Sequence, residues 1–247
     1  MAYEHFAFLY DKLMVDAPYD LWIEYVESEF ENYCEPVQTI VDLGCGTGEI
    51  SLRLMEKGFD VLGVDLSSEM LTVAKEKATK KGMNLPLLQQ NMTDLNVMKQ
   101  VDAVLILCDS LNYLENQEQV IQTFSSVYKS LRPGGLFVFD VHSIYKMENV
   151  FNQSPFVSTN QGISYIWNCF EGFYPYTVEH ELTFFVEEKD HSYTRFDEDH
   201  VQRTFPIEEY SLWLKKAGFI SLKVTSDFGK KDFSKAERIF FVAKKDF

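Results

Sequence analysis

Cysteine is scarce in this chain of 247 residues, and its four cysteines lie far apart. They form no CxxC pair and have no nearby histidine at the spacing of a metal site. This excludes a disulfide scaffold and a clustered zinc site, so we expect no bound metal. We interpret Cys34, Cys45, Cys108 and Cys169 as free thiols in a reducing cytoplasm.

Long hydrophobic runs are also missing. Glu4 and Asp11 stand where a secretion signal would need an unbroken apolar stretch. The longest uncharged stretch, residues 149–170, is interrupted by Pro155, Gly162 and many polar side chains, which rules it out as a membrane span. We therefore expect a soluble, cytoplasmic protein that does not associate with membranes.

The chain has few positively charged residues. Lys and Arg number 23 against 38 Asp and Glu, which gives a net charge of -15. A surface of that charge repels a phosphate backbone, so nucleic acid is an unlikely partner. The apolar content of 46% and the charged content of 25% are typical of a globular protein with a large core.

Short apolar runs alternate with amphipathic stretches from about residue 38 to residue 141. Strands that are apolar on both faces and separated by helices indicate a parallel sheet covered on both sides. Ser67 is placed to cap one helix and Gly82 to close it, while residues 133–135 (Pro-Gly-Gly) should stop another helix before the fifth strand. That second helix should present one apolar face, made of Val120, Ile121, Phe124, Val127, Tyr128 and Leu131.

The chain on either side of this region predicts further elements. Leu21, Trp22, Tyr25, Val26 and Phe30 indicate an N-terminal helix lying over the sheet. After residue 141, three stretches rich in aromatic and β-branched residues predict an antiparallel three-stranded insertion, followed by a helix with the apolar face Pro206, Ile207, Tyr210, Leu214 and Ala217, which Gly218 ends.

The last two predicted strands are joined by only the eight residues 229–236, too few for a parallel crossover. The fold class is therefore α/β: a seven-stranded, mostly parallel, doubly wound sheet with an antiparallel C-terminal hairpin, plus an antiparallel β insertion. We expect residues 1–36 to form a helical cap over a cofactor site. Residues 37–150 and 205–247 should form the core, and residues 151–204 the insertion that covers an acceptor site.

A glycine-rich turn follows the first strand, with Gly44, Gly46 and Gly48 before a helix. Glycines let a ligand approach the backbone, and a helix N-terminus attracts negative charge, although a turn without a ligand is the alternative. A dinucleotide fingerprint would need a third glycine where this chain has Glu49, which disfavours NAD. Asp65 ends the second strand, where a carboxylate can accept hydrogen bonds from both ribose hydroxyls of an adenosine-containing cofactor.

Four motifs together resemble those of the class I S-adenosylmethionine-dependent methyltransferases. They are D-x-G-x-G-x-G at residues 42–48, Asp65, QQNMTDL and LRPGGLFVFDV. The resemblance covers about residues 38–141, and the closing hairpin extends it. It implies a Rossmann-like methyltransferase with S-adenosyl-L-methionine as its cofactor.

The resemblance also implies which residues hold the cofactor. The glycine turn would wrap the amino-acid part, and Asp65 would bind the ribose while Leu66 packs on the adenine. Related sequences usually carry Asp where this chain has Asn91, whose carbonyl oxygen would still accept from the adenine amino group. The implied contacts are Asp42, Gly44, Cys45, Gly46, Gly48, Asp65, Leu66, Asn91 and the Met92 backbone, with Cys108 and Asp109 along the methionine portion.

The segments FAFLYDKLMVDAPYDLW and CDSLNYL resemble those of bacterial methyltransferases that act on small molecules. In such enzymes N-terminal aromatic residues close over the cofactor, which would bring Tyr10, Tyr19 and Trp22 near it. Core packing is the alternative for this aromatic stripe.

The acceptor site should lie above the C-terminal strand edges, under the insertion. An aromatic and acidic pocket there would suit an amine or a planar heterocycle. The aromatic residues expected in that roof are Tyr165, Trp167, Phe170, Phe173, Tyr174 and Tyr176; the alternatives for them are the insertion's own core or a homodimer interface.

We therefore predict a methyltransferase that transfers a methyl group from S-adenosyl-L-methionine to a small-molecule acceptor, mainly by alignment and desolvation. No catalytic residue is demanded. If a base is needed, His142, His180 and His200 are candidates, with an ordinary polar role as the alternative for each. Methylation of RNA or protein, and a non-catalytic cofactor-binding protein, are the competing hypotheses.

Overall fold

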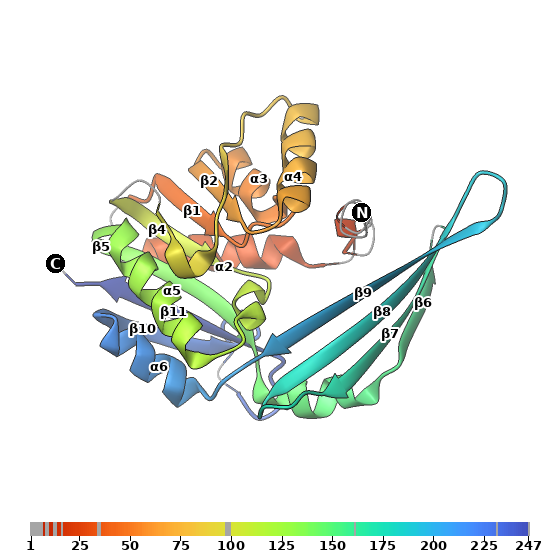
Figure 1. The fold of residues 1–247 in the computed structure, drawn as a ribbon. Coiled ribbons are helices and arrows are strands. Elements are labelled where there is room, and N and C mark those ends of the chain that lie inside the picture. Colours follow the sequence, from red (N-terminus) through yellow and green to blue (C-terminus); the bar gives the residue numbers. More distant parts are fainter. Residues whose placement is uncertain are drawn as a thin grey trace.

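The chain forms two β-sheets, a large core sheet flanked by helices and a smaller sheet that projects from it (Figure 1). The computed structural model describes residues 7, 10–11, 14–15, 17–33, 36–96, 100–160, 162–230 and 232–246. The core sheet contains β1 (Thr39–Leu43), β2 (Asp60–Asp65), β3 (Leu87–Gln89), β4 (Val101–Ile106), β5 (Leu131–His142), β10 (Phe219–Ser226) and β11 (Arg238–Lys245). Its helices are α2 (Tyr19–Tyr33), α3 (Glu49–Glu56), α4 (Ser68–Lys80), α5 (Gln117–Ser130) and α6 (Ile207–Lys216).

The core sheet is mostly parallel, as predicted. Its strand order is β10-β11-β5-β4-β1-β2-β3, and β11 runs antiparallel to both of its neighbours. The short connection between β10 and β11 thus forms the expected closing hairpin. The C-terminal ends of β1, β2, β4 and β5 meet at one edge of the sheet, where ligands bind in such folds.

Helices cover both faces of this sheet because successive strand residues point to opposite sides. Val104 and Ile106 of β4 pack in one cluster with α5 and α6, whereas Ala103 and Leu105 pack in the other with α2 and α3. Both clusters are buried. This explains why the core strands read as continuous apolar runs.

The predicted helix signals are largely confirmed. The Ser67 hydroxyl accepts a hydrogen bond from the Met70 backbone N–H at 3.2 Å, and Gly82 takes a positive φ of 70° just after α4. In α2, Leu21 is an exception: it is 43% exposed, on the side of the helix away from the sheet, so its place in the predicted apolar face was wrong.

The end of α5 also differs from the prediction. The helix stops at Ser130, and Leu131 already begins β5 instead of completing the helical face. The Pro-Gly-Gly segment lies inside the strand, where the pairing shifts between Leu131 and Leu136. It therefore makes an irregularity in β5 and does not separate helix from strand.

The insertion is a four-stranded antiparallel sheet, not the predicted three-stranded one. It contains β6 (Phe156–Asn160), β7 (Ile163–Glu171), β8 (Thr177–Glu187) and β9 (Tyr193–Arg203). The prediction missed β6 because that edge strand is short and its sequence, FVSTN, has neither a clear alternation nor a buried face. The long strands of the insertion, β7, β8 and β9, run away from the core sheet in Figure 1. Short helical turns η3 (Lys146–Val150) and η4 (Phe151–Gln153) connect β5 to this sheet.

Candidate active site

The glycine turn after β1 has the geometry of a ligand cradle. Gly44, Gly46 and Gly48 have φ values of 81°, 52° and 79°, a region that favours glycine. A Cβ at Gly44 would lie 2.7 Å from the Ser110 Cβ, so a side chain is also excluded there by packing. The N-cap residue of α3, Gly48, has no side chain to cap the helix, and in the first turn the Asp42 carboxylate accepts from the Ser51 N–H. The N-terminus of a helix carries partial positive charge and favours a ligand with acceptor atoms.

Asp65 ties the end of β2 to this turn. Its Oδ2 accepts a hydrogen bond from the Gly46 N–H at 2.7 Å, and its Oδ1 accepts one from the Ser67 N–H at 2.9 Å. Burial raises the pKa of the Asp65 carboxyl, while these two bonds oppose that shift. Each carboxylate oxygen has capacity for a further hydrogen bond.

Asp42, the first residue of the glycine motif, is buried beneath the turn. Its Oδ2 accepts a hydrogen bond from the Ser51 hydroxyl of α3 at 2.5 Å. Burial raises the pKa of Asp42 to about 6, and the Ser51 hydrogen bond only partly offsets this. The structure therefore places this carboxylate as a support between β1 and α3.

We expect Asp42→Asn to stabilise the protein in alkaline solution. A carboxyl whose folded pKa is raised contributes stability that is full below its ordinary value of 3.8 and is lost as the pH rises through about 6. Asparagine cannot ionise and still accepts from Ser51, so the variant should gain about 2 kcal/mol at about pH 8 and nothing at about pH 4. Urea unfolding at both pH values measures the difference; equal stability at both would contradict the assignment.

The predicted adenine contacts lie beyond Asp65. Leu66 is 65% exposed, with its side chain open to a ligand. The Asn91 Oδ1 accepts hydrogen bonds from the Thr93 N–H at 3.0 Å and the Thr93 hydroxyl at 2.9 Å. Both lone pairs of that oxygen are therefore used, which is at odds with the expectation that it accepts from the adenine amino group. Met92 packs partly buried against the core.

Cys108 and Asp109 form a strained turn at the end of β4. Their φ values are 55° and 57°, an uncommon region for residues other than glycine. The carboxylate of Asp140, fully buried in β5, accepts from the Cys108 N–H at 2.9 Å and from the Asp109 N–H at 3.0 Å. It also accepts from the Trp22 indole N–H at 2.9 Å and from Arg238. Asp140 thus links α2, β4 and β11 and supports the turn.

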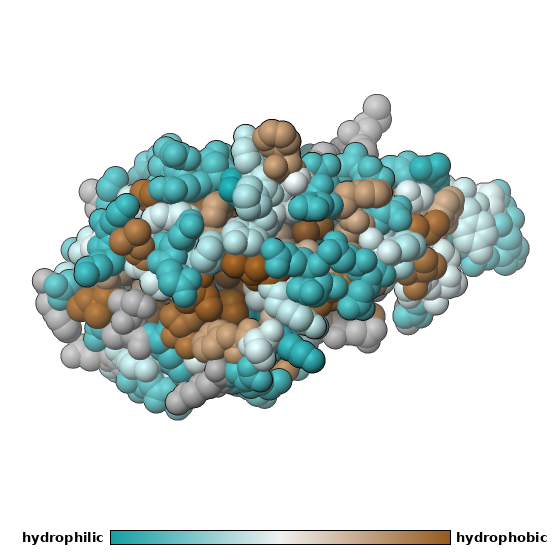
Figure 2. All heavy atoms as spheres, turned by 90° about the horizontal axis from the view of Figure 1, so that it is seen from below, coloured by the Kyte–Doolittle hydropathy of each residue, from teal (hydrophilic) through white to brown (hydrophobic). Residues whose placement is uncertain are grey.

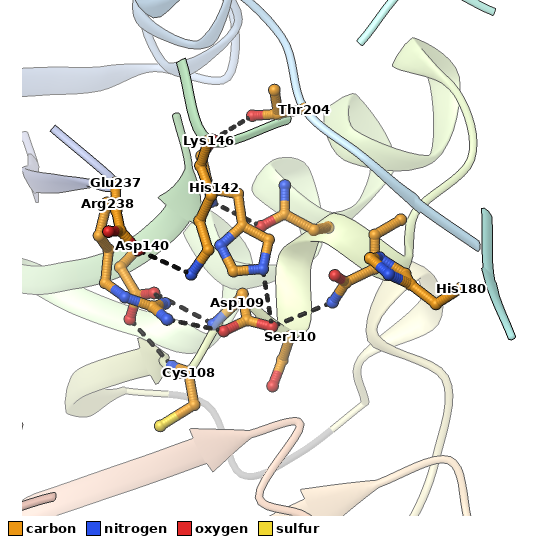
Figure 3. A network of polar contacts seen from close by, with 12 residues as sticks. Cys108, Asp109, Ser110, Asp140, His142, Lys146, His180, Thr204, Glu237 and Arg238 are labelled. Atoms are coloured by element: carbon orange, nitrogen blue, oxygen red, sulfur yellow. Dashed lines mark hydrogen bonds and ion pairs between the residues drawn. The ribbon is translucent and has the colours of Figure 1, made fainter. Parts of the chain in front are cut away.

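The Asp109 carboxylate is the meeting point of a second set of contacts (Figure 3). It accepts from the Arg238 Nη2 at 2.8 Å and from the Gln202 Nε2 at 3.0 Å, and its Oδ2 lies 3.3 Å from the His142 Nε2. Burial tends to raise the pKa of Asp109, but His142 and Arg238 hold it well below its ordinary value. Because Gln202 belongs to β9, the insertion touches a residue that we had placed in the cofactor site alone.

A cavity of about 320 Å³ opens beside this network, between the N-terminal segment, the strand ends and the insertion. It is lined by Tyr10, Tyr19 and Trp22, predicted to lie near the cofactor, and by Cys108 and Asp109, predicted to lie along its methionine portion. The hydroxyl of Ser110, the residue after Asp109, donates to the Gly44 carbonyl at 3.1 Å and so links the Cys108–Asp109 turn to the glycine turn.

Of the six aromatic residues predicted for the roof, Tyr165 and Trp167 line the cavity and the other four do not. Phe170, Phe173 and Tyr174 are exposed, and Tyr176 lies in the turn before β8, outside the cavity lining. Side chains alternate across a strand, so β7 presents Phe170 on the opposite face from Trp167.

All three candidate histidines line the cavity, although they come from β5, β8 and β9. Burial lowers the pKa of His142 and of His200, and lowers that of His180 to about 4. Burial thus favours the neutral form of each ring, while Asp109 acts in the opposite direction on His142. His180 and His200 are paired across β8 and β9, which explains why they face the same side of the insertion.

Sequence reasoning missed Asp140, Arg238 and Gln202. A charged residue inside an apolar strand, such as the Asp in GLFVFDV, is a signal that could have marked Asp140, since buried charges need partners. No signal pairs it with Arg238, which lies 98 residues further along the chain.

The described residues show no sign of a disulfide, a clustered metal site or a membrane-spanning helix. Cys45, Cys108 and Cys169 are free thiols, while Cys34 lies outside the described residues. Among the described residues no group of three or more His, Cys, Asp or Glu side chains is arranged to hold a metal, and no helix is long and apolar enough to cross a membrane. Seen from below, hydrophobic side chains gather mainly on the core half of the molecule (Figure 2).

Known proteins resemble this chain over part or all of its length. A family model described as a methyltransferase domain matches residues 40–135. A putative methyltransferase of Geobacillus sp. (strain WCH70) is 49% identical over 247 residues, which are 99% of this chain and 100% of the relative. A glycine/sarcosine N-methyltransferase of Halorhodospira halochloris is 31% identical over 216 residues, 84% of this chain and 75% of that protein.

Among solved structures, the crystal structure of an S-adenosylmethionine-dependent methyltransferase from Clostridium acetobutylicum ATCC 824 superposes with a TM-score of 0.88. It is 30% identical to this chain, and the match covers 100% of both chains. The similarity therefore includes the insertion as well as the core sheet.

Proposed function

Because this chain belongs to the class I S-adenosylmethionine-dependent methyltransferases, we propose that it transfers a methyl group to a small-molecule acceptor held in the cavity under the insertion. One observation carries the proposal. The cavity has Cys108, Asp109 and Trp22 on one side and Trp167 and His180 on the other, so the methyl donor and the acceptor would meet inside it.

The residues of the chain suit its cofactor, S-adenosyl-L-methionine. The backbone of the glycine turn would hold the amino-acid part, the free lone pairs of Asp65 would accept from the ribose hydroxyls, and Leu66 would pack on the adenine. Tyr10, Tyr19, Trp22, Cys108 and Asp109 would surround the methionine end. When bound, the cofactor supplies an electrophilic methyl group on a sulfonium.

Catalysis then depends mainly on positioning. The leaving group of a sulfonium is already activated, so the chain has to align the nucleophile with the methyl group and exclude water. The strained Cys108–Asp109 turn, supported by Asp140, sets the position of the cofactor's methionine end. The insertion sets the position of the acceptor. The neutral histidines can take a proton where the nucleophile carries one.

Incubation with isotope-labelled S-adenosyl-L-methionine and a metabolite extract tests the proposal. Mass spectrometry should find a labelled methyl group on one small molecule, with S-adenosylhomocysteine formed in equal amount. A labelled methyl group in RNA or protein instead would favour the competing hypothesis of a macromolecular acceptor. The net charge of -15 disfavours RNA as that acceptor. Cofactor binding with no label in any fraction would favour a non-catalytic protein.

We expect Asp65→Ala to weaken cofactor binding by about 1.5 to 3 kcal/mol, the range for hydrogen bonds to a charged group. Calorimetry with S-adenosyl-L-methionine measures the loss, and NAD serves as the ligand that should not bind. Glu49, at the position of the third dinucleotide glycine, puts a carboxylate at the start of α3. Asp60→Ala, at the exposed start of the same strand, is the matched control. An unchanged dissociation constant in Asp65→Ala would show that this residue is structural only.

A further inference from the structure

We infer that Lys77 is a positioning residue for the cofactor: it holds Asp11 of the N-terminal segment on the glycine turn and so slows the release of the bound cofactor. The inference rests on the cofactor site of the proposed function and adds a residue that does not line the cavity. Three observations carry it: the contacts of Lys77, the place of Asp11 in a segment that borders the cavity, and the position of Thr47 in the glycine turn.

Lys77 lies on α4 and brings three parts of the chain together. Its Nζ lies 2.8 Å from the Asp11 Oδ2 and is also paired with the carboxylate of Glu49, at the start of α3. The Thr47 hydroxyl lies 3.4 Å from the same Nζ and donates to the Asp11 Oδ1 at 2.6 Å. Asp11 therefore docks through both carboxylate oxygens, one on a hydroxyl of the glycine turn and the other on the cation beside it.

Burial makes this ion pair the stronger of two that anchor the start of the chain. The side chains of Lys77 and Asp11 are only 18% and 28% exposed, so water and salt screen their attraction less than that of an exposed pair. The other pair, Arg53 with Asp20 at 2.5 Å, ties the start of α2 to α3, but Asp20 is 79% exposed. Exposed pairs contribute little. Of the two cations, we therefore expect Lys77 to hold the segment.

The segment that Asp11 anchors borders the cavity. Tyr10, the residue before Asp11, lines the cavity, and Met14 and Tyr19 line it further along the chain. The side chains of Tyr10 and Tyr19 are hydrogen-bonded to each other, and the Met14 N–H donates to the Tyr10 carbonyl at 2.9 Å. Because Tyr10 and Asp11 are neighbours in the chain, the place of the Tyr10 ring at the cavity depends on where Asp11 is held.

Thr47 connects this anchor to the cofactor side of the site. It is buried within the glycine turn, next to Gly46, whose N–H donates to Asp65 at 2.7 Å. A cofactor held by this turn, with its methionine end in the cavity, lies against the wall that the N-terminal segment forms. Such a wall has to open before the ligand leaves. Opening breaks the contacts of Asp11, so the ion pair with Lys77 opposes it.

Surface plasmon resonance on the immobilised full-length protein tests the inference, with S-adenosylhomocysteine as the probe. Lys77→Met keeps the aliphatic stem and removes the charge, so the probe should dissociate at least five-fold faster than from wild type. Asp11→Asn keeps an oxygen for Thr47 but loses the ion pair, and should speed dissociation at least three-fold. The double variant should stay within two-fold of Lys77→Met, because both changes remove one contact. An unchanged rate in Lys77→Met, or a double variant in which the two increases multiply, overturns the inference.

Two controls separate this role from a contact that merely joins α3 to α4. Lys81→Met is matched to Lys77→Met, since Lys81 follows α4 and pairs with Glu56 of α3 at 2.7 Å. Glu49→Gln removes the other acidic partner of Lys77 and leaves Asp11 in place. Both should release the probe within two-fold of the wild-type rate, with the thermal transition of every variant followed alongside. An increase in either control equal to that in Lys77→Met would assign the effect to the α3–α4 contact and refute the role of Asp11. Failure of S-adenosylhomocysteine to bind wild type would instead refute the cofactor site of the proposed function, so the two failures are distinguishable.

Discussion

Asp140→Ala is expected to lower the free energy of unfolding by about 3 to 5 kcal/mol, the cost of leaving one member of a buried ion pair without its partner. The Asp140 carboxylate is fully buried and pairs with Arg238. Its loss also leaves the Trp22, Cys108 and Asp109 N–H groups without their acceptor. Binding of S-adenosyl-L-methionine should fall with stability, because the strained turn beside the methionine site loses its support.

A double variant separates the two effects. Removing both charges, as in Asp140→Ala with Arg238→Met, should recover part of the stability because Arg238 is no longer left without Asp140, although Asp109 then loses its ion pair with Arg238. It should not recover cofactor affinity, since the turn still lacks its acceptor. Asp199→Ala, on the exposed outer face of β9, is the control. Urea unfolding and calorimetry on the three variants decide the matter. Wild-type stability in Asp140→Ala would contradict the role of this carboxylate.

Trp167→Ala should lower methyl transfer to the true acceptor at least ten-fold while leaving S-adenosyl-L-methionine affinity within a few-fold of wild type. Trp167 lines the cavity on the side that we propose for the acceptor, and its indole N–H donates to the His180 Nδ1. The predicted cofactor residues lie on the core and the N-terminal segment, so their contacts should survive. Transfer is measured as S-adenosylhomocysteine formed with the acceptor identified from the metabolite extract.

Phe170→Ala is the matched control, because Phe170 lies on the same strand and faces outward, 49% exposed. Loss of the Trp167 ring is expected to cost about 3 to 5 kcal/mol of stability, so the thermal transition must be followed in both variants. Tyr176, which was expected in the roof, lies in a turn outside the cavity, so a substitution there would not report on the acceptor site. Normal transfer by a stable Trp167→Ala variant would favour a dimer interface for the insertion, which sedimentation at several concentrations would detect.

Local patterns in the sequence were enough to predict most of the core. The apolar runs of β1, β4 and β5 and the cap at Ser67 depend on neighbouring residues, and the eight-residue connection alone requires the antiparallel hairpin. Errors arose where local signals were weak or ambiguous. Edge strand β6 lacks an alternating pattern, and Leu131 suits a helical face as well as the start of a strand.

The sequence predicted the part of the candidate site that follows the core strands better than the part that lies on the insertion. The glycine turn, Asp65, Leu66 and the Cys108–Asp109 pair follow directly after strands, so strand order brings them to one edge of the sheet. The roof aromatics were only partly correct, because the strand alternation that separates Trp167 from Phe170 depends on which face of the insertion meets the core.

The sequence by itself determined the α/β fold, the methyltransferase family and the glycine turn, because each depends on residues close together in the chain. Only the tertiary structure decided the chemistry of the cavity. Asp109 meets Arg238 across 129 positions, and Trp22 meets Asp140 across 118. The charge of the cavity depends on such pairings, since a buried ionisable group takes its state from whichever group the fold places within hydrogen-bond distance.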